Sequence, residues 1–151
     1  MSYEEPRGLE VDVEIDAPRD DVFDVVAATD RWPELITVID DGEVLTPHAR
    51  GEGVELHWYV RVVGVTVEVF ETIDGYEPPE LLTWTSLDRS AWSHEGGIRF
   101  EDAGGSTKVY AWMDYDVPSV ADNALVRWLF KWRFQKGMER SFENVRAELE
   151  S

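Results

Sequence analysis

The side chains that could do chemistry in this 151-residue sequence are few. His94 shares a predicted strand face with Trp92 and Phe100, where an imidazole could orient a ligand carbonyl or act as an acid or base. Tyr115 and Ser86 could each donate a hydrogen bond to a ligand oxygen. His94 and Tyr115 are therefore the candidate catalytic residues. A simpler interpretation, favoured for His94, is that these groups are hydrogen-bonded within the protein.

No further catalytic pattern is present. The sequence has no Ser-His-Asp arrangement, no Gly-rich phosphate loop and no pair of inward carboxylates; residues 75–80 and 101–107 form turns that do not lead from a strand into a helix. Asp114 and Asp116 have the outward parity of their predicted strand. Enzyme activity thus has no positive signal, and whether the protein is an enzyme stays open.

The sequence also predicts no metal and no cofactor. It has no cysteine, which excludes disulfides and Cys-bound zinc. His57 has the opposite parity to the inward Trp58, and His48 lies in a predicted turn, so the three histidines do not gather at ligand spacing. Carboxylates alone would give only a hard-cation site.

The strands that must position these residues are visible as alternating stretches. Apolar side chains alternate strictly with acidic ones from Leu9 to Ile15, as in a strand with one wet face. Six more predicted strands follow, separated by turns rich in Gly, Pro and Asp. The Asp-Asp-Gly stretch at residues 40–42 predicts a turn before the first of them. These strands are Glu43–His48, Gly53–Val63, Val65–Tyr76, Leu81–Asp88, Ser93–Glu101 and Thr107–Val117. A bulge near Gly64 stays possible.

Three helices complete the pattern. Pro18 is expected as the first residue of one short helix, and Trp32-Pro33 starts a second. A long helix, about 45 Å at 1.5 Å per residue, is expected from an N-cap at Ser119 to Leu149. Its main apolar row is Ala121, Leu125, Trp128, Trp132, Phe142, Val145 and Leu149, and its second row is Val126, Phe130 and Phe134.

Length and composition predict a single α+β domain over residues 9–150, preceded by a flexible segment, residues 1–8. The start of the chain lacks an apolar signal region, and no run reaches the roughly 20 apolar residues of a spanning helix. A cytoplasmic protein without integral membrane association is therefore expected. The oligomeric state stays open.

The charge is strongly acidic. Asp and Glu number 32 against 14 Lys and Arg, a formal net charge of −18. Such a surface argues against a nucleic-acid partner, because a phosphate backbone requires a basic face. The acidic residues are spread along the chain like a solvated coat. We therefore hypothesise a halophilic protein, since high ionic strength would screen the repulsion among these charges.

The order of one strand, two short helices, six strands and a long helix resembles the START-like helix-grip superfamily (SRPBCC), which includes polyketide cyclase/dehydrase and lipid-transport proteins. The residues that carry the resemblance are 11–36, with Ala17-Pro18 and Trp32-Pro33, together with 76–84 and 104–118. The resemblance implies a curved seven-stranded antiparallel sheet, a long C-terminal helix packed across it over a cavity, and two short helices that close one end. Members range from ligand carriers to cyclases and hydrolases, so the chemistry does not transfer with the fold.

Strand parity then selects the side chains that would face the cavity. The predicted ligand-binding residues are Leu56, Trp58, Trp84, Ser86, Trp92, His94, Phe100, Met113, Tyr115, Leu125, Trp128 and Trp132. Leu82, Ile98, Val109 and Leu129 share their faces. A cavity of about 300–1,000 Å³ lined in this way would suit a flat or long apolar ligand.

These residues allow three functions. The preferred one is a carrier or sensor that binds a hydrophobic small molecule such as a lipid, quinone, isoprenoid or polyketide-like aromatic. The second is a cyclase or dehydratase in which His94 or Tyr115 moves a proton. The third is an interaction protein whose tryptophans fill the core, with Trp112 and Tyr110 on a contact surface.

Overall fold

The computed structural model describes residues 8–62, 64–116 and 124–150. The strands are β1 (Leu9–Ile15), β2 (Ile39–Val44), β3 (Glu55–Val62), β4 (Val65–Glu77), β5 (Leu81–Ser86), β6 (His94–Asp102) and β7 (Thr107–Tyr115). The helices are α1 (Arg19–Ala27), the 3₁₀ helix η1 (Thr29–Arg31), α2 (Trp32–Leu35) and α3 (Ala124–Glu150).

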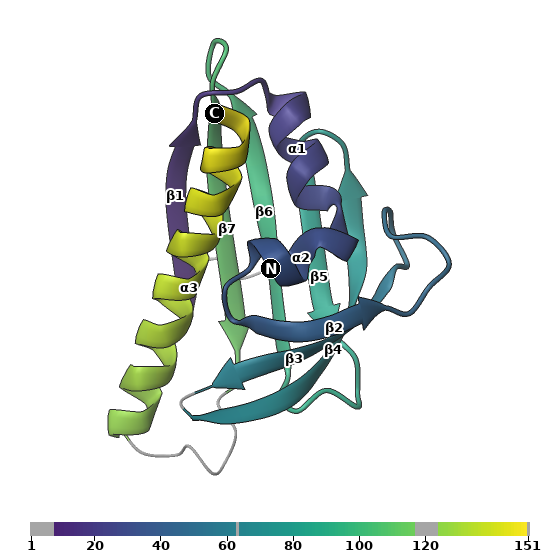
Figure 1. The fold of residues 1–151 in the computed structure, drawn as a ribbon, viewed down its shortest axis with the longest axis vertical. Coiled ribbons are helices and arrows are strands. Elements are labelled where there is room, and N and C mark those ends of the chain that lie inside the picture. Colours follow the sequence, from purple (N-terminus) through teal and green to yellow (C-terminus); the bar gives the residue numbers. More distant parts are fainter. Residues whose placement is uncertain (1–7, 63, 117–123, 151) are drawn as a thin grey trace, which may run out of the picture.

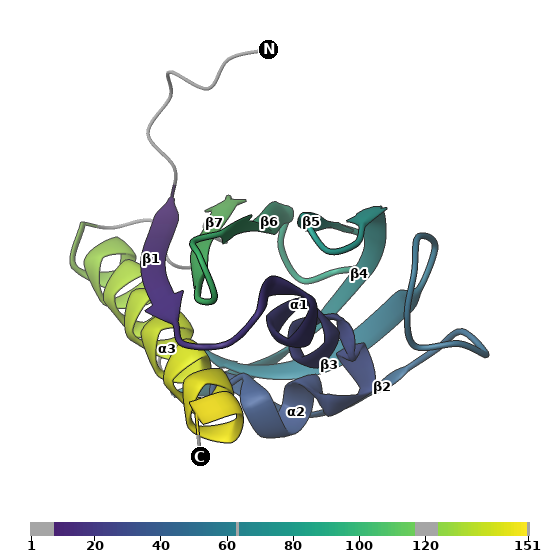
Figure 2. The ribbon, with the colours of Figure 1, turned by 90° about the horizontal axis from the view of Figure 1, so that it is seen from above.

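All seven strands join one antiparallel sheet in the order β1-β7-β6-β5-β4-β3-β2. The sheet curves so strongly that β2 and β3 cross in front of the lower ends of the other strands (Figure 1). Seen from above, α1 and α2 lie inside this curve and α3 runs beside β1 (Figure 2). The predicted α+β helix-grip architecture is confirmed, including the two short helices after the first strand.

The second strand starts earlier than the sequence predicted. The Asp-Asp-Gly stretch, expected to be a turn, lies within β2, where a register shift between Ile39 and Asp41 makes a bulge. Gly42 pairs with Trp58, and a Cβ added at Gly42 would lie 2.4 Å from the Trp58 ring. The prediction of a turn was wrong because this glycine serves the close approach of an indole.

The β3–β4 pairing is continuous from Glu55↔Thr72 to Val62↔Val65, so the bulge that the sequence allowed near Gly64 is not present in this ladder. The irregularity of β4 lies instead between Ile73 and Gly75, opposite β5. An unbroken register keeps one set of β4 side chains, at 67, 69, 71 and 73, on the concave face.

At the start of α1, Pro18 is the N-cap rather than the first helical residue, and Asp20 and Asp21 lie in the first turn as the sequence predicted. Trp32 begins α2, and its indole Nε1–H donates to the carbonyl oxygen of Val26 at 2.8 Å. This bond fixes an indole from α2 inside the curve of the sheet, where only 4% of its surface stays exposed.

The buried face of α3 is not the one that the main apolar row predicted. Phe130 and Phe134 are buried, whereas Leu125, Trp128 and Trp132 are 66%, 60% and 50% exposed. Two residues along a helix correspond to about 200° around its axis, so burial of the phenylalanines places Trp128 and Trp132 on the opposite side. Their two rings stack on each other, with centroids 6.4 Å apart. The predicted N-cap Ser119, Ala121 and the strand end Val117 lie outside the described residues.

A tight seam joins the middle of α3 to the connection between α2 and β2. The backbone N–H of Thr37 donates to Ser141 Oγ at 3.2 Å, and Asn144 Nδ2 donates to the carbonyl oxygen of Leu35 at 3.0 Å. Gly137 sits where a Cβ would meet Val38 Cγ1 at 2.6 Å. The absent side chain therefore lets Val38 pack directly on the helix backbone.

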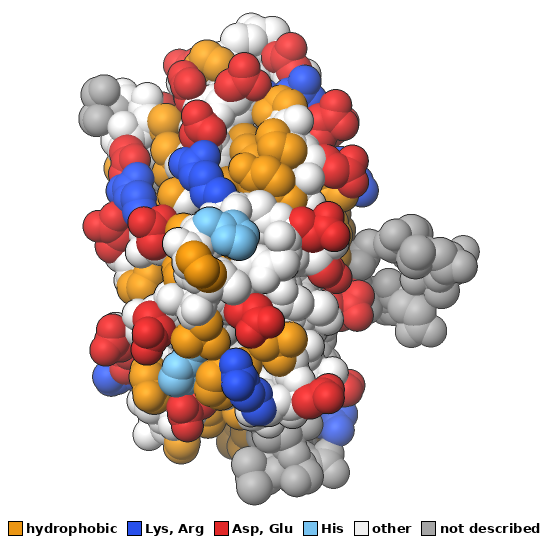
Figure 3. Space-filling model, turned by 90° about the vertical axis from the view of Figure 1, so that its right-hand side faces the viewer, with side chains coloured by type: hydrophobic (Ala, Val, Ile, Leu, Met, Phe, Trp, Pro, Cys, Tyr) orange, Lys and Arg blue, Asp and Glu red, His pale blue; other side chains and the backbone are white. Residues whose placement is uncertain are grey.

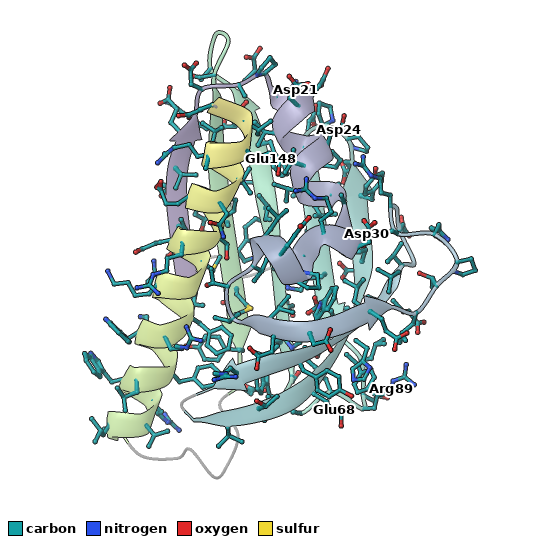
Figure 4. All side chains as sticks on the ribbon, viewed as in Figure 1. Asp21, Asp24, Asp30, Glu68, Arg89 and Glu148 are labelled. Carbon is teal, nitrogen blue, oxygen red and sulfur yellow. The ribbon has the colours of Figure 1, made fainter. Side chains whose placement is uncertain are left out.

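A second contact ties the end of α3 to η1. Figure 4 shows Glu148 on the side of α3 that faces α1. Its carboxylate accepts from Arg31 Nη1 at 2.6 Å, and hydrogen bonding to Arg31 lowers the pKa of Glu148. Because both side chains are about one third exposed, the pair is worth little, and the seam at Gly137 is the firmer connection.

No helix among the described residues is long and apolar enough to cross a membrane. The division into a flexible segment 1–8 and a domain 9–150 stays a prediction, since residues 1–7 lie outside the described part of the chain.

The close contact between Gly137 and Val38 predicts how an added methyl group at Gly137 changes stability. Gly137→Ala should lower the free energy of unfolding by about 1 to 2 kcal/mol, because the overpacking against Val38 exceeds the roughly 1 kcal/mol that alanine gains in a helix. Urea unfolding measures this change, and Lys136→Ala, on the exposed side of the same turn, should leave stability within about 0.5 kcal/mol. In a Val38→Ala background the cost should disappear. An equal cost in both backgrounds would rule out the clash as its cause.

Candidate ligand-binding cavity

A cavity of about 140 Å³ lies between the concave face of the sheet and the helices α2 and α3. From the strands it is lined by Trp58, Val60, Val69, Glu71, Trp84, His94, Ile98, Ala111 and Met113. Ile39 of β2 also lines it, and from the helices and connections it is lined by Val26, Trp32, Leu35, Ile36, Val38, Trp92, Phe134, Met138, Ser141, Phe142 and Val145. The seam described above thus forms one wall.

Indoles form much of this lining. Trp32 stacks on Trp58 with centroids 6.0 Å apart and meets Trp84 edge-on at 5.7 Å. Trp92 meets Phe134 of α3 edge-on at 6.1 Å. The indoles touch one another and still leave a void, so the filled core of an interaction module is not what the structure shows.

The cavity is smaller than the 300–1,000 Å³ expected from the sequence. The expected volume was too large because the sequence placed Trp32 in a short helix and did not predict that its indole enters the cavity. Its indole, held by Val26, occupies space between Trp58 and Trp84. A bulky side chain from α2 thereby reduces the room that the curved sheet leaves.

One charged group stands in this apolar surrounding. Glu71 of β4 is 5% exposed, and its Oε1 lies 2.7 Å from Nε2 of His94, which is 6% exposed. Its Oε2 accepts a hydrogen bond from Trp58 Nε1–H at 3.1 Å. Buried carboxylates require such partners because removal from water is costly. The three side chains form a polar cluster in the cavity wall, and we call it the Glu71 cluster.

Sequence reasoning missed Glu71. The signal was present in β4, where Val67, Val69, Glu71 and Ile73 have the same parity. A carboxylate in phase with three β-branched apolar residues indicates a buried charge, which needs a partner on a neighbouring strand. His94 was the available partner, two strands away.

The structure brings five of the predicted ligand-binding residues to the cavity wall: Trp58, Trp84, Trp92, His94 and Met113. Four of them lie on the strand faces that the alternation predicted. Trp92 lies before the start of β6. Whether they bind a ligand stays a prediction.

The other strand residues of that set lie elsewhere. Leu56 and Phe100 are buried in the core away from the cavity, with Phe100 packed edge-on against Phe23 at 5.2 Å. Ser86 Oγ accepts a hydrogen bond from the backbone N–H of His94 at 3.0 Å, so it positions the histidine instead of lining the void. All three have the predicted parity, but Leu56 and Phe100 are buried in the core and Ser86 is half-buried.

Tyr115 and three helix residues are corrected more strongly. Tyr115 packs against Phe130 at 4.9 Å outside the cavity, and burial raises the pKa of its hydroxyl. Tyr115 therefore does not line the cavity, and its role as a proton donor stays a prediction. Leu125, Trp128 and Trp132 lie on the exposed side of α3, because Phe130 and Phe134 occupy its buried face.

Within the described ranges, no three His, Asp or Glu side chains gather closely enough to hold a metal ion. His57 lies on the outer face of β3, where Nε2 is 2.9 Å from Glu68 and the ring stacks on Phe70 at 4.1 Å. The expectation of no metal and no cofactor stays a prediction.

Comparison with known proteins gives the same class as the fold. The family described as polyketide cyclase/dehydrase and lipid transport matches residues 7–150, and the chain belongs to this family. This is the family that the sequence resemblance indicated, and solved structures share its START-like helix-grip fold. No protein with curated annotation matches it.

Three solved structures illustrate the similarity. TTHA0849 from Thermus thermophilus has a TM-score of 0.78 at 17% identity, over 93% of this chain and 95% of its own. The Zhui aromatase/cyclase from Streptomyces sp. R1128 has a TM-score of 0.78 at 17% identity, over 94% and 92%. A START superfamily protein from Mycobacterium smegmatis has a TM-score of 0.73 at 16% identity, over 94% and 96%. At these identities the likeness shows the fold alone.

The Glu71 cluster predicts a specific loss of stability. Glu71→Ala should lower the free energy of unfolding by about 3 kcal/mol, because the His94 ring and the Trp58 N–H lose their buried acceptor. Glu68→Ala, an exposed glutamate of the same strand, should cost less than about 1 kcal/mol. Urea denaturation of both variants, and of Glu71→Ala combined with His94→Ala, tests this. Additive costs for the double variant would show that the two side chains are not coupled.

Proposed function

We propose that the protein binds a hydrophobic small molecule in the cavity between the sheet and α3. The observation that carries the proposal is a cavity of about 140 Å³ whose wall is apolar except for the Glu71 cluster and Ser141. Apolar pockets with a few placed polar groups are the usual form of small-molecule sites. Burial of apolar ligand surface would supply the affinity, at roughly 25 cal/mol per Å² before ordering costs.

The volume bears on the size of the ligand. A dry apolar cavity of about 150 Å³ in another protein holds benzene, so this one accepts a single ring without rearrangement. Of the expected ligand classes, a lipid, quinone, isoprenoid or polyketide-like aromatic would enter first with a ring or chain end of that size. A larger part would require movement at the seam between Val38 and Gly137, which forms one wall.

A second function is favoured by the Glu71 cluster. A buried carboxylate bonded to an imidazole in a cavity is an arrangement that can move a proton. A cyclase or dehydratase would use it to act on a bound ligand, and one structural neighbour is an aromatase/cyclase. A His94→Ala variant that binds ligand normally but loses turnover would favour this enzyme over the carrier.

Filling the cavity tests the carrier proposal. Ala111 is fully buried in β7 and lines the void, so Ala111→Leu should occupy part of it and weaken the binding of apolar ring compounds at least tenfold. Stability should stay within about 1.5 kcal/mol, because the added atoms enter empty space. Indole fluorescence and native mass spectrometry followed by organic extraction measure the bound ligand.

Trp132→Ala is the matched control, since it removes an indole on the exposed side of α3 and should leave affinity unchanged. If Ala111→Leu bound such compounds as tightly as the unaltered protein, binding would lie outside the cavity and the carrier proposal would fail.

We also propose that the acidic coat adapts the protein to a salt-rich cytoplasm. Of the Asp and Glu side chains in the described ranges, Glu71 alone is buried. Figure 3 shows acidic side chains spread over the whole visible face, with few basic ones between them. Their mutual repulsion favours the unfolded chain unless salt screens it.

The salt dependence of stability tests this proposal. The urea midpoint at pH 7 should rise steeply between roughly 0.1 and 2 M KCl, because the Debye length falls from about 10 Å to a few Å in that range. Near pH 4 the rise should be smaller, since many carboxylates are then protonated and the repulsion is reduced. A midpoint indifferent to KCl at pH 7 would refute the halophilic interpretation.

A further inference from the structure

The hydrogen bonds of the Glu71 cluster define what it can still offer to a ligand. His94 Nε2 is engaged with Glu71 Oε1 at 2.7 Å, and the Trp58 indole N–H with Oε2 at 3.1 Å. The second nitrogen of His94, Nδ1, lies 3.5 Å from the carbonyl oxygen of Trp92. The polar hydrogens of the cluster are therefore directed within the protein.

Acceptor capacity remains. A carboxylate has about four lone-pair positions, and the two contacts with His94 and Trp58 use one on each oxygen. With a single contact on each oxygen, Oε2 keeps a free lone pair. Glu71 is one of the residues that line the cavity, so a ligand bound there lies against this side chain.

The other polar side chain of the wall is also committed as a donor. The Ser141 hydroxyl donates to the carbonyl oxygen of Gly137 at 2.7 Å and accepts from the backbone N–H of Thr37 at 3.2 Å. It is part of the seam that fastens α3 to the α2–β2 connection. Its hydrogen is therefore not directed at a ligand.

We infer that Glu71 accepts a hydrogen bond from the ligand, so that the cavity selects a single-ring molecule bearing a hydroxyl group over the corresponding ketone or hydrocarbon. The inference rests on the proposed function and names the chemical class of its ligand. Hydrogen bonds to a charged acceptor are roughly twice as strong as those between neutral groups. A ligand carbonyl would instead bring its oxygen against the carboxylate oxygens, which repel it.

Three probes separate this inference from the proposed function. Toluene tests whether the cavity takes an apolar ring at all. Cyclohexanol and cyclohexanone have nearly the same size, and only the alcohol carries a donor. Dissociation constants come from NMR titrations, in which the Trp58 indole N–H resonance reports directly on its acceptor Glu71.

The unaltered protein should bind cyclohexanol at least about tenfold more tightly than cyclohexanone, and the alcohol should shift the Trp58 resonance more. Glu71→Gln, which keeps the shape and removes the charge, should bring the ratio of the two dissociation constants to within about threefold. Met138→Leu changes an apolar part of the wall and should leave the ratio unchanged. This pair of variants separates the acceptor from the packing.

The outcomes are distinct. Binding of toluene with equal or tighter binding of the ketone would overturn the inference and leave the proposed function standing. Failure of all three probes to bind would overturn the proposed function and the inference together. If Glu71→Gln did not fold, the ratio measured on the unaltered protein would still decide, because it depends on no substitution.

Discussion

The structure depends on one constraint, which is that the carboxylate of Glu71 is buried in an apolar interior and must be hydrogen-bonded there. Its partners come from two other strands, Trp58 from β3 and His94 from β6. Ser86, which pairs with Glu71 across β4 and β5, in turn holds the backbone N–H of His94. A slip of one residue in any of these ladders would turn a member of the cluster to the outer face. The polar cluster and the register of the curved sheet therefore specify each other.

The same fold can enclose very different volumes, and here individual side chains decide. The curve of the sheet makes room, and Trp32 from α2 takes part of it by stacking on Trp58. On the other side, Gly137 lets the α2–β2 connection approach α3 closely. Similarity to solved structures at 16–17% identity shows the shared architecture but not these side chains. The cavity volume therefore follows from side chains of this sequence and not from the fold that it shares with those structures.

The sequence predicted the architecture because alternation and turn residues are local signals. Parity alone placed Trp58 and Trp84 on the concave face, where the structure has them. It could not choose between the two apolar rows of α3, since Trp128 and Phe130 are both large and apolar and only packing against Trp92 and Tyr115 selects the phenylalanine. The parity of β4 marks Glu71 as inward, but its partner His94 lies 23 residues away. Long-range packing selects the buried row of α3 and the partner of Glu71, and no local pattern contains these contacts.

Binding and catalysis would make different demands on this one cluster. Both nitrogens of His94 face protein acceptors, so the imidazole meets a ligand only through Glu71. A carrier of a hydroxylic ring would need Glu71 only to accept a hydrogen bond. An enzyme needs a proton to leave the ligand, and the Glu71 carboxylate could take this proton while it stays hydrogen-bonded to His94. The arrangement of Glu71 and His94 is compatible with both binding and catalysis, and the reactivity of the ligand would decide which of the two occurs. A stable hydroxylic ring would simply be held. Elimination would require Glu71 to take a C–H proton from the carbon next to the one that bears the leaving group, so that the C–H electrons form the double bond and the leaving group departs with its bonding pair.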